Sequence, residues 1–192
     1  MKKLIAITGG IGSGKTTVSA YIKSKGYNVY DCDEIARKIS DNEEIIDKIK
    51  DTFGSQFVYN GKIMRKELAE YCFKDENLTQ KLNAIYHKAI FENLKLLIEA
   101  DKNDTVFAEV PLLYETKTQK NFDEVWLVCA DKEKQIERAL IRSGYSYENV
   151  MNRIARQLPT EYKKTLADKI IENNGEIQGL YHQIDVLLLQ KK

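Results

Sequence analysis

A glycine-rich loop near the N-terminus constrains the fold of this chain more than any other feature. The run at positions 9–16 fits the pattern G-x-x-x-x-G-K-[ST], and the apolar residues 3–7 directly before it predict a short buried strand. The residues after the loop have helical apolar spacing up to Gly26, which is typical of a helix end. Strand, loop and helix in this order predict a phosphate-binding loop rather than a simple glycine-rich turn.

Each residue type in this loop has a chemical reason to be there. Glycines let backbone N–H groups converge on phosphate oxygens, Lys15 can reach the β- and γ-phosphates, and the Thr16 hydroxyl can bind Mg²⁺. The following helix directs its positive end at the same anion. We therefore expect nucleotide contacts from the residues Gly10, Ile11, Gly12, Ser13, Gly14, Lys15, Thr16 and Thr17.

The composition limits the other possible partners. At 192 residues and 43% hydrophobic content, the chain suits one domain with a sizeable core. The 30 basic and 29 acidic residues leave a net charge of +1, so no overall field would attract nucleic acid or an anionic membrane. The first apolar stretch is too short for a signal peptide or a membrane span. Three widely spaced cysteines without nearby histidines argue against a zinc site or disulfides and favour a reducing cytoplasm.

Arginine is rare in this chain and strongly clustered. Only six of the 30 basic residues are arginine, and four of these lie within positions 138–156. The planar guanidinium suits phosphate, so the cluster predicts a phosphate clamp, although a helix surface that happens to carry arginine would also explain it. Arg138 and Arg142 share one face of a predicted helix, which a short turn joins to a second helix. This pattern is typical of a mobile lid, which we assign to residues 141–158.

The second predicted strand covers residues 27–30, and two aspartates follow it directly. Residues two apart in an extended chain face the same way, so Asp31 and Asp33 are expected to project together from the strand's carboxyl end, where ligands bind in open α/β sheets. Two acids beside a phosphate site suit a general base and a metal or water contact. The alternative is that they cap the helix predicted over 34–39.

A region without apparent strands separates the second strand from the third. Its apolar spacing and turn residues predict helices over 43–53, 65–73 and 77–100, with a turn at Asn60-Gly61. We expect residues 41–104 to form a helical insert, a lobe over the ligand end of the sheet. Its notable polar residues are Arg65 and His87, although a lone histidine on a helix is more often an ordinary packed or surface residue.

The rest of the chain alternates strands with helices. The pattern predicts strands over 105–110, 124–129 and 168–171, and a closing helix over 176–189. This order favours a three-layer α/β fold with a five-stranded parallel sheet and helices on both faces. Its nucleotide-binding core comprises residues 1–40, 105–140 and 159–192. Near the end of the third strand and in the segment after it, Glu109 or Glu115 could face the site.

Six short motifs follow one another along the chain: ITGGIGSGKT at 7–16, Asp31-x-Asp33, VPLLYE at 110–115, Gln135-x-x-Arg138-x-x-x-Arg142, Arg153-x-x-x-Gln157 and ADxIIxN at 167–173. Together they resemble the motifs of the dephospho-coenzyme A kinase family of P-loop kinases. The phosphate-binding loop alone indicates only a nucleotide, whereas the whole set is specific. Family members usually carry His-Pro where this chain has His87-Lys88, and the backbone N–H of Lys88 predicts a straighter helix.

The resemblance implies transfer of the γ-phosphoryl group of ATP, with Mg²⁺, to the 3′-hydroxyl of dephospho-coenzyme A, the last step of coenzyme A synthesis. It implies that Asp33 is the general base and that Lys15 and Arg138 stabilise the transferring phosphoryl group, with Arg142 assisting. It further implies that the insert binds the acceptor through Arg65 and His87. Phosphoryl transfer needs little beyond in-line positioning and charge neutralisation, which agrees with these roles.

Other functions remain open at this point. A nucleoside monophosphate kinase shares the phosphate-binding loop and an arginine-lined lid. A GTP-dependent regulatory switch would require Asn-Lys-x-Asp after a late strand, and residues 173–175 do not supply this motif. The same residues are candidates for adenine recognition. Near-zero net charge disfavours a nucleic-acid-binding ATPase. We expect small-molecule substrates, no nucleic acid or membrane partner, a monomer or weak homo-oligomer, and a cytoplasmic location.

Overall fold

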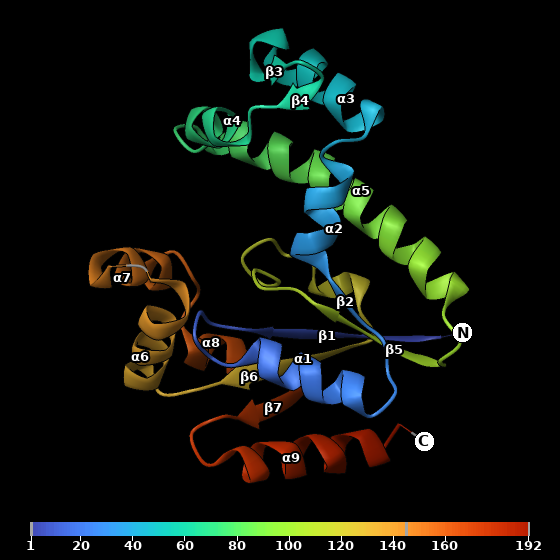
Figure 1. Ribbon diagram of the computed structural model, residues 1–192, viewed down its shortest axis with the longest axis vertical. Helices are drawn as coiled ribbons and strands as arrows, with labels where there is room; N and C mark the ends of the chain where they lie inside the picture. Colours follow the sequence, from blue (N-terminus) through green and yellow to red (C-terminus); the bar gives the residue numbers. More distant parts are fainter. Residues whose placement is uncertain (1, 145, 192) are drawn as a thin grey trace. The chain divides into compact units, whose positions relative to one another are not determined.

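The computed structural model describes residues 2–144 and 146–191, and its helices and strands are labelled in Figure 1. The strands are β1 (Lys3–Gly9), β2 (Val29–Asp31), β3 (Val58–Tyr59), β4 (Lys62–Ile63), β5 (Thr105–Glu109), β6 (Glu124–Cys129) and β7 (Lys169–Glu172). The α-helices are α1 (Lys15–Ser24), α2 (Cys32–Ile39), α3 (Glu43–Phe53), α4 (Arg65–Cys72), α5 (Glu76–Ala100), α6 (Lys132–Ser143), α7 (Tyr147–Ala155), α8 (Thr160–Lys164) and α9 (Ile177–Leu189). The 3₁₀ helices are η1 (Ser55–Phe57) and η2 (Gln119–Asn121).

A five-stranded sheet has the strand order β2-β5-β1-β6-β7. β1 lies at its centre and pairs in parallel with β5 on one side and β6 on the other, and β6 pairs in parallel with β7. The predicted five-stranded parallel sheet is thus confirmed. Because parallel strands end on the same side, the segments that follow β1, β6 and β7 meet at one edge (Figure 1).

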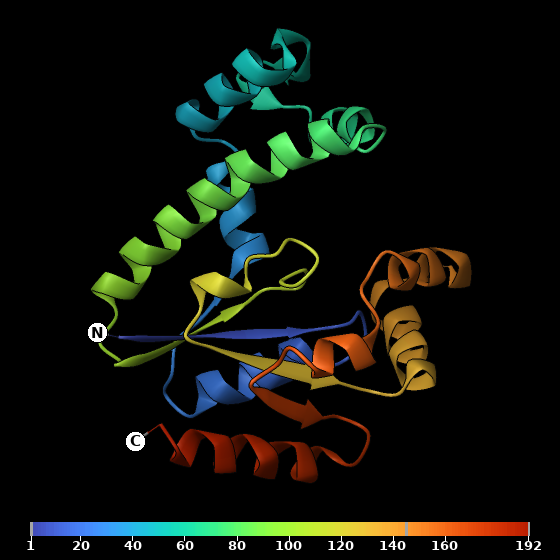
Figure 2. The same ribbon diagram turned by 180° about the vertical axis from the view of Figure 1, so that it is seen from behind.

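Successive residues of β1 face opposite sides of the sheet. Ile5 is buried in a core cluster with Val18 of α1 and Leu180 of α9. Ala6 belongs instead to a second cluster with Leu113. Figures 1 and 2 show α1 and α9 on one face of the sheet and α8 on the other. Helices therefore cover both faces, as the continuous apolar run of β6 requires.

The chain forms two compact units, one made of residues up to Tyr30 and from Asp101 onward, the other of Asp31–Ala100. The first unit contains α1, α6, α7, α8 and α9, and the second contains α2, α3, α4 and α5 with β3 and β4. The functional division predicted above, with a core up to residue 40 and a lid at 141–158, remains a prediction. Each unit is described by itself below.

The second unit is not purely helical, which corrects the prediction of an insert without strands. β3 and β4 form a two-stranded antiparallel sheet in which Val58 pairs with Ile63. Between them, Asn60 has a φ of 48° and Gly61 a φ of 71°, and these positive values suit the asparagine and glycine of a tight hairpin turn. Each strand has only two residues, which is too short for an alternating pattern to show.

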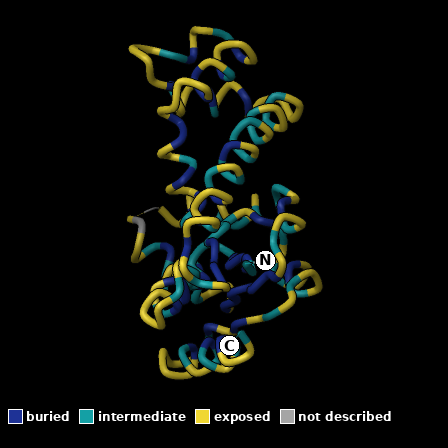
Figure 3. Tube along the Cα trace, turned by 90° about the vertical axis from the view of Figure 1, so that its right-hand side faces the viewer, coloured by how far each residue is buried: buried dark blue, intermediate teal, exposed yellow. Residues whose placement is uncertain are grey.

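The long helix α5 continues through His87 and Lys88, as the lysine in place of proline predicts. At its start, the Asp75 carboxylate accepts the backbone N–H of Asn77 at 2.7 Å, which makes Asp75 the cap of this helix. Ala89 and Leu94 are buried residues of this helix, and half-buried and exposed residues occur along it (Figure 3).

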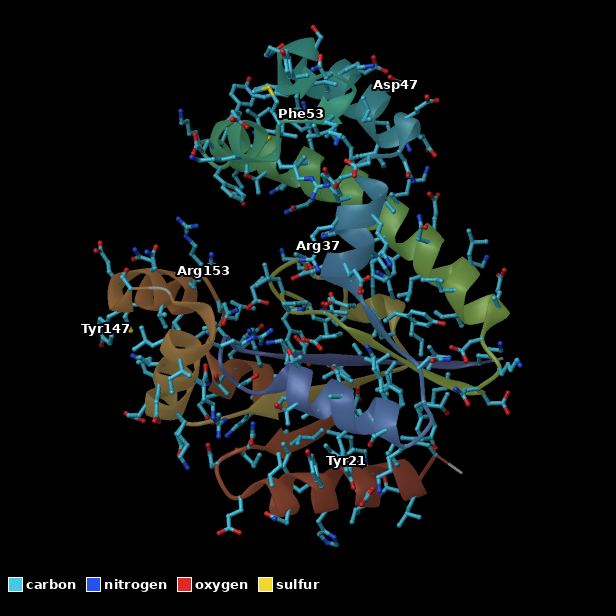
Figure 4. The ribbon with its side chains drawn as sticks, in the orientation of Figure 1. Tyr21, Arg37, Asp47, Phe53, Tyr147 and Arg153 are labelled. Atoms are coloured by element: carbon cyan, nitrogen blue, oxygen red, sulfur yellow. The ribbon has the colours of Figure 1, made fainter. Side chains whose placement is uncertain are left out.

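Helices α6 and α7 supply the predicted helix pair of the lid. Gly144 ends α6 in a left-handed conformation, with a φ of 63°. The Ser146 hydroxyl then caps α7 by accepting the backbone N–H of Asn149 at 3.3 Å. Figure 4 labels Tyr147 and Arg153 on α7. Gly144 therefore marks the end of α6, and Ser146 marks the start of α7.

The three cysteines are buried with free thiols. Burial raises the pKa of the Cys72 thiol, and it raises that of Cys129 to about 11. Because the thiolate is the reactive form, both side chains behave as small apolar core residues at neutral pH. Among the described residues, no helix combines the length and the apolar character needed to cross a membrane.

Glu124, the first residue of β6, is buried and lies at the centre of an ion network. Its carboxylate lies 2.7 Å from Nζ of Lys3 and 2.5 Å from Nζ of Lys191, and it accepts the indole N–H of Trp126 at 2.7 Å. Burial alone would raise the pKa of this carboxyl, but the bonds to Lys191, Lys3 and Trp126 outweigh it and lower the pKa to about 2. The network ties β1 and the end of the chain to β6.

We expect Glu124→Gln to lower the free energy of unfolding by about 3 kcal/mol at pH 7, because it leaves Lys191 buried without its counter-charge. The folded carboxyl has the lower pKa, so its contribution is complete above the ordinary value of 4.5 and is lost as the pH falls toward about 2. Urea unfolding of both proteins at several pH values measures the difference. A difference below about 1 kcal/mol at pH 7, or one that grows on acidification, contradicts this expectation.

Candidate active site

The glycine-rich loop turns tightly from β1 into α1. Gly14 has a left-handed φ of 98° and is the N-cap of α1. A Cβ atom on Gly12, which has a φ of 72°, would lie 2.1 Å from the carbonyl oxygen of Gln135, and one on Gly14 would lie 2.1 Å from Nδ2 of Asn173. Side chains are therefore excluded at both positions. The loop can bring its backbone N–H groups close to an anion at the start of α1.

Lys15 lies across this loop. Its ammonium group donates to the carbonyl oxygen of Gly9 at 2.8 Å and to that of Gly10 at 3.0 Å. These bonds hold the positive charge of Lys15 at the N-terminal end of the loop. In the same loop the Ser13 hydroxyl is buried and has no hydrogen-bond partner within the described structure. A buried polar atom without a partner is unusual, and it fits a loop shaped around an anion.

Two side-chain amides brace the loop from outside. Nδ2 of the buried Asn173 donates to the carbonyl oxygen of Ser13 at 2.8 Å. Oε1 of Gln157 accepts the backbone N–H of Ile11 at 3.0 Å. Asn173 follows β7, and Gln157 follows α7. The loop is thus fixed by residues that are distant in the sequence and carry no charge.

A third amide, that of Gln135 on α6, closes the space beside Gly10. Gln135 is buried, its Nε2 donates to the carbonyl oxygen of Ala130 at 2.7 Å, and its Oε1 would lie 2.7 Å from a Cβ atom on Gly10. All three amides lie in the family motifs, but the motifs alone give none of them a role as a brace of the loop. For Gln135 and Asn173 the available signal was their position, since they follow β6 and β7, whose carboxyl ends lie at the same sheet edge as the loop.

Helix α6 directs two arginines toward the loop. Nη1 of Arg138 donates to the carbonyl oxygen of Asn173 at 3.0 Å, and Nη1 of Arg142 donates to the Thr16 hydroxyl at 3.2 Å. Residues four apart lie on one helical face, so both guanidinium groups reach the same side of α6. Arg142 therefore contacts the hydroxyl that the sequence analysis assigned to Mg²⁺.

A cavity of about 250 Å³ lies beside the start of α1. Its wall consists of the residues Gly14, Thr17, Arg138, Asn173, Gly175 and Ile177. It therefore joins the phosphate-binding loop, the arginine of α6 and the segment after β7. This segment includes residues 173–175, the candidates for adenine recognition.

Asp31 and Asp33 do not project together from a strand, which corrects the prediction. The strand ends at Asp31, whose carboxylate accepts the backbone N–H of Asp33 at 2.8 Å and that of Glu34 at 3.1 Å. Asp31 is therefore the N-cap of α2, as the alternative reading proposed. Asp33 lies in the first turn of α2 and is exposed.

The candidate acceptor contacts, Arg65 and His87, lie in the second unit together with Asp33. Arg65 begins α4, donates from Nη2 to the carbonyl oxygen of Arg37 at 2.9 Å, and lies 3.6 Å from the Asp41 carboxylate. Arg37 is labelled on α2 in Figure 4. His87 is half-buried on α5, and burial lowers its pKa, so that the imidazole is neutral at pH 7.

Glu109, the last residue of β5, and Glu115, in the segment after it, have structural partners. Glu109 accepts the Ser19 hydroxyl at 2.7 Å. Glu115 lies 2.6 Å from Nζ of the buried Lys163 and accepts the backbone N–H of Leu158 at 2.9 Å. Glu115 thus anchors α8 and the segment after α7. None of these bonds of Glu109 and Glu115 is made with the phosphate-binding loop.

A glycine-rich cradle at the carboxyl edge of a parallel sheet, with a lysine across it and two arginines from a neighbouring helix, defines a kinase of the P-loop class. The family model described as "Dephospho-CoA kinase" matches residues 3–179. The chain belongs to the dephospho-CoA kinase family.

Individual relatives agree with this assignment over nearly the whole chain. A dephospho-CoA kinase of Fusobacterium nucleatum is 37% identical over 183 residues, which covers 95% of each chain. A crystal structure from Thermus thermophilus has a TM-score of 0.88 at 33% identity and covers 100% of this chain and 98% of its own. The dephospho-CoA kinase from Campylobacter jejuni has a TM-score of 0.68 at 25% identity, with the same coverage.

Proposed function

We propose that this chain transfers the γ-phosphoryl group of ATP to the 3′-hydroxyl of dephospho-coenzyme A, the final step of coenzyme A biosynthesis. The observation that carries the proposal is the family match over residues 3–179, which includes the phosphate-binding loop and both arginines of α6. The reaction forms a bond between the acceptor oxygen and the γ-phosphorus. It breaks the bond between the γ-phosphorus and the oxygen that bridges the β- and γ-phosphates, and this oxygen leaves with ADP. The acceptor proton passes to a base.

The first unit supplies the donor site in this proposal. Backbone N–H groups at the start of α1 bind the phosphates, and Lys15 leaves the carbonyl oxygens of Gly9 and Gly10 to reach the terminal phosphate. The cavity lined by Gly14 and Asn173 binds the adenosine. This agrees with its position next to the loop that binds the phosphates. Arg138 and Arg142 neutralise charge that moves onto the γ-phosphoryl oxygens.

The residues present fit a bound Mg²⁺. The Thr16 hydroxyl stands at the first turn of α1 and now accepts from Arg142 at 3.2 Å, so it is an oxygen ligand that can exchange one cationic partner for another. When bound, Mg²⁺ neutralises charge on the β- and γ-phosphates. Arg142 would then turn its guanidinium to the phosphate oxygens.

The second unit supplies the acceptor site in this proposal. Asp33 takes the proton of the 3′-hydroxyl as the general base. Arg65 retains N–H donors beyond its bond to the Arg37 carbonyl, and these suit a phosphate group of the acceptor. His87, neutral because burial lowers its pKa, acts as a hydrogen-bonding contact rather than as a cation. We further propose a cytoplasmic enzyme that is a monomer or a weak homo-oligomer.

A substrate panel tests the proposal. ADP release is coupled to a spectroscopic assay and measured with ATP and either dephospho-coenzyme A or each common nucleoside monophosphate. We expect turnover with dephospho-coenzyme A and at least 100-fold lower kcat/KM with the monophosphates. Turnover confined to the monophosphates would overturn the assignment in favour of a nucleoside monophosphate kinase. Calorimetric preference for GTP without turnover would favour a regulatory switch.

A further inference from the structure

Gln157 contacts the phosphate-binding loop beside Gly10, which binds the Lys15 ammonium group. Oε1 of Gln157 accepts the Ile11 N–H at 3.0 Å, and the residue before Ile11 is Gly10, whose carbonyl oxygen binds the Lys15 ammonium at 3.0 Å. A loop lysine of this kind reaches the β- and γ-phosphates. The backbone segment that Gln157 fixes is therefore the one beside the terminal phosphate of the donor.

The backbone around Gln157 is itself held firmly. Its N–H donates to the carbonyl oxygen of Ile154 at 3.0 Å. The next residue, Leu158, donates its N–H to Glu115, and Glu115 forms the ion pair with Lys163. This ion pair is buried, with exposed side-chain fractions of 2% for Lys163 and 13% for Glu115. Gln157 is thus a firmly held support for the loop, although it lies within the predicted lid at residues 141–158.

We propose that Gln157 is a positioning residue that fixes the Ile11 segment for recognition of the γ-phosphate. The inference deepens the proposed function, because it rests on ATP as the donor. Asn173 braces the other part of the loop at Ser13, next to the N–H groups that bind the inner phosphates. Loss of the Gln157 contact should therefore weaken binding of the outer phosphate selectively.

The amide of Gln157 suits this position by its charge and length. A carboxylate there would accept the Ile11 N–H equally well but would repel a phosphate. A shorter side chain would leave the backbone N–H without its acceptor, at a cost typical of a lost hydrogen bond. Gln157→Met is therefore the informative variant, since methionine keeps the length and shape of the side chain but lacks a strong acceptor.

The experiment compares nucleotide affinities by calorimetry in wild type and Gln157→Met, with Mg²⁺ present. We expect the affinity for a non-hydrolysable ATP analogue to fall at least fivefold and the affinity for ADP to change less than twofold. Turnover with dephospho-coenzyme A should fall about tenfold, largely in kcat rather than in the KM for the acceptor. Equal losses for both nucleotides would indicate a purely structural role and overturn the inference, as would unchanged affinities.

Gln183→Met is the matched control. Oε1 of Gln183 also accepts a backbone N–H, that of Glu172 at 2.9 Å, but not one of the loop. We expect both affinities of this variant to remain within twofold of wild type, and a selective loss of the ATP analogue here would also overturn the inference. The affinities need no acceptor, so they decide the role of Gln157 even if the substrate panel refutes dephospho-coenzyme A.

Discussion

Asp33→Asn is expected to lower turnover at least 1,000-fold while the affinity for ATP stays within about twofold. Asparagine keeps the size of the side chain but cannot accept the proton of the acceptor hydroxyl. Because Asp33 is in the first turn of α2 and is not its N-cap, the substitution should leave the helix intact. Initial rates with both substrates saturating, together with calorimetric titration of ATP, measure the two quantities.

Asp31→Asn provides a control two residues away. The Asp31 side chain accepts the N–H groups of Asp33 and Glu34, and asparagine caps helices about as well as aspartate. We therefore expect a loss of turnover below tenfold. Asp33→Asn retaining more than a tenth of wild-type turnover, or equal losses in the two variants, would refute Asp33 as the base and return the roles of the pair to an open question.

The aspartate pair also shows where sequence-based reasoning fails. An extended strand and a helix N-terminus are both compatible with acids two residues apart, and the choice depends on where the strand ends. The structure ends β2 at Asp31, so one carboxylate becomes a cap and the other enters the helix. The hairpin of β3 and β4 was missed for a related reason, since two-residue strands have no readable alternation, although Asn60-Gly61 did mark their turn.

Long, regular patterns were predicted well because they are set locally. α3 and β6 have the predicted bounds, since Gly54 ends the helix and every residue of β6 after Glu124 is apolar. The parallel sheet followed from the alternation of strands and helices. The amides around the loop could not be derived in this way. Gln157 and Ile11 are 146 positions apart, and only the folded sheet edge brings them together.

The bracing contacts also connect the loop to an arginine. Asn173 donates to the Ser13 carbonyl through its side chain, and its own carbonyl oxygen accepts from Arg138. One buried residue after β7 thus links the phosphate-binding loop to α6. Arg138 needs only one N–H for this bond, and the other donors of its fork can face the cavity that it lines.

Arg138→Lys is therefore expected to lower kcat about 1,000-fold, although it keeps the positive charge. A lysine ammonium is a single point of charge. It cannot bond to the Asn173 carbonyl and present a planar pair of N–H donors to phosphoryl oxygens at the same time. The KM for ATP should rise less than tenfold, because the loop and Lys15 supply most of the ground-state binding. Steady-state rates with varied ATP at saturating acceptor separate the two effects.

Arg156→Lys is the matched control for this substitution. Arg156 is exposed at the end of α7, and the same change there should leave kcat within twofold. If Arg138→Lys retained more than a tenth of wild-type kcat, the guanidinium fork would not be needed and charge alone would suffice at this position. If kcat fell but the affinity for ADP fell equally, Arg138 would act mainly by shaping the cavity with Asn173, and the stabilisation of the moving phosphoryl group would rest on Lys15 and Arg142.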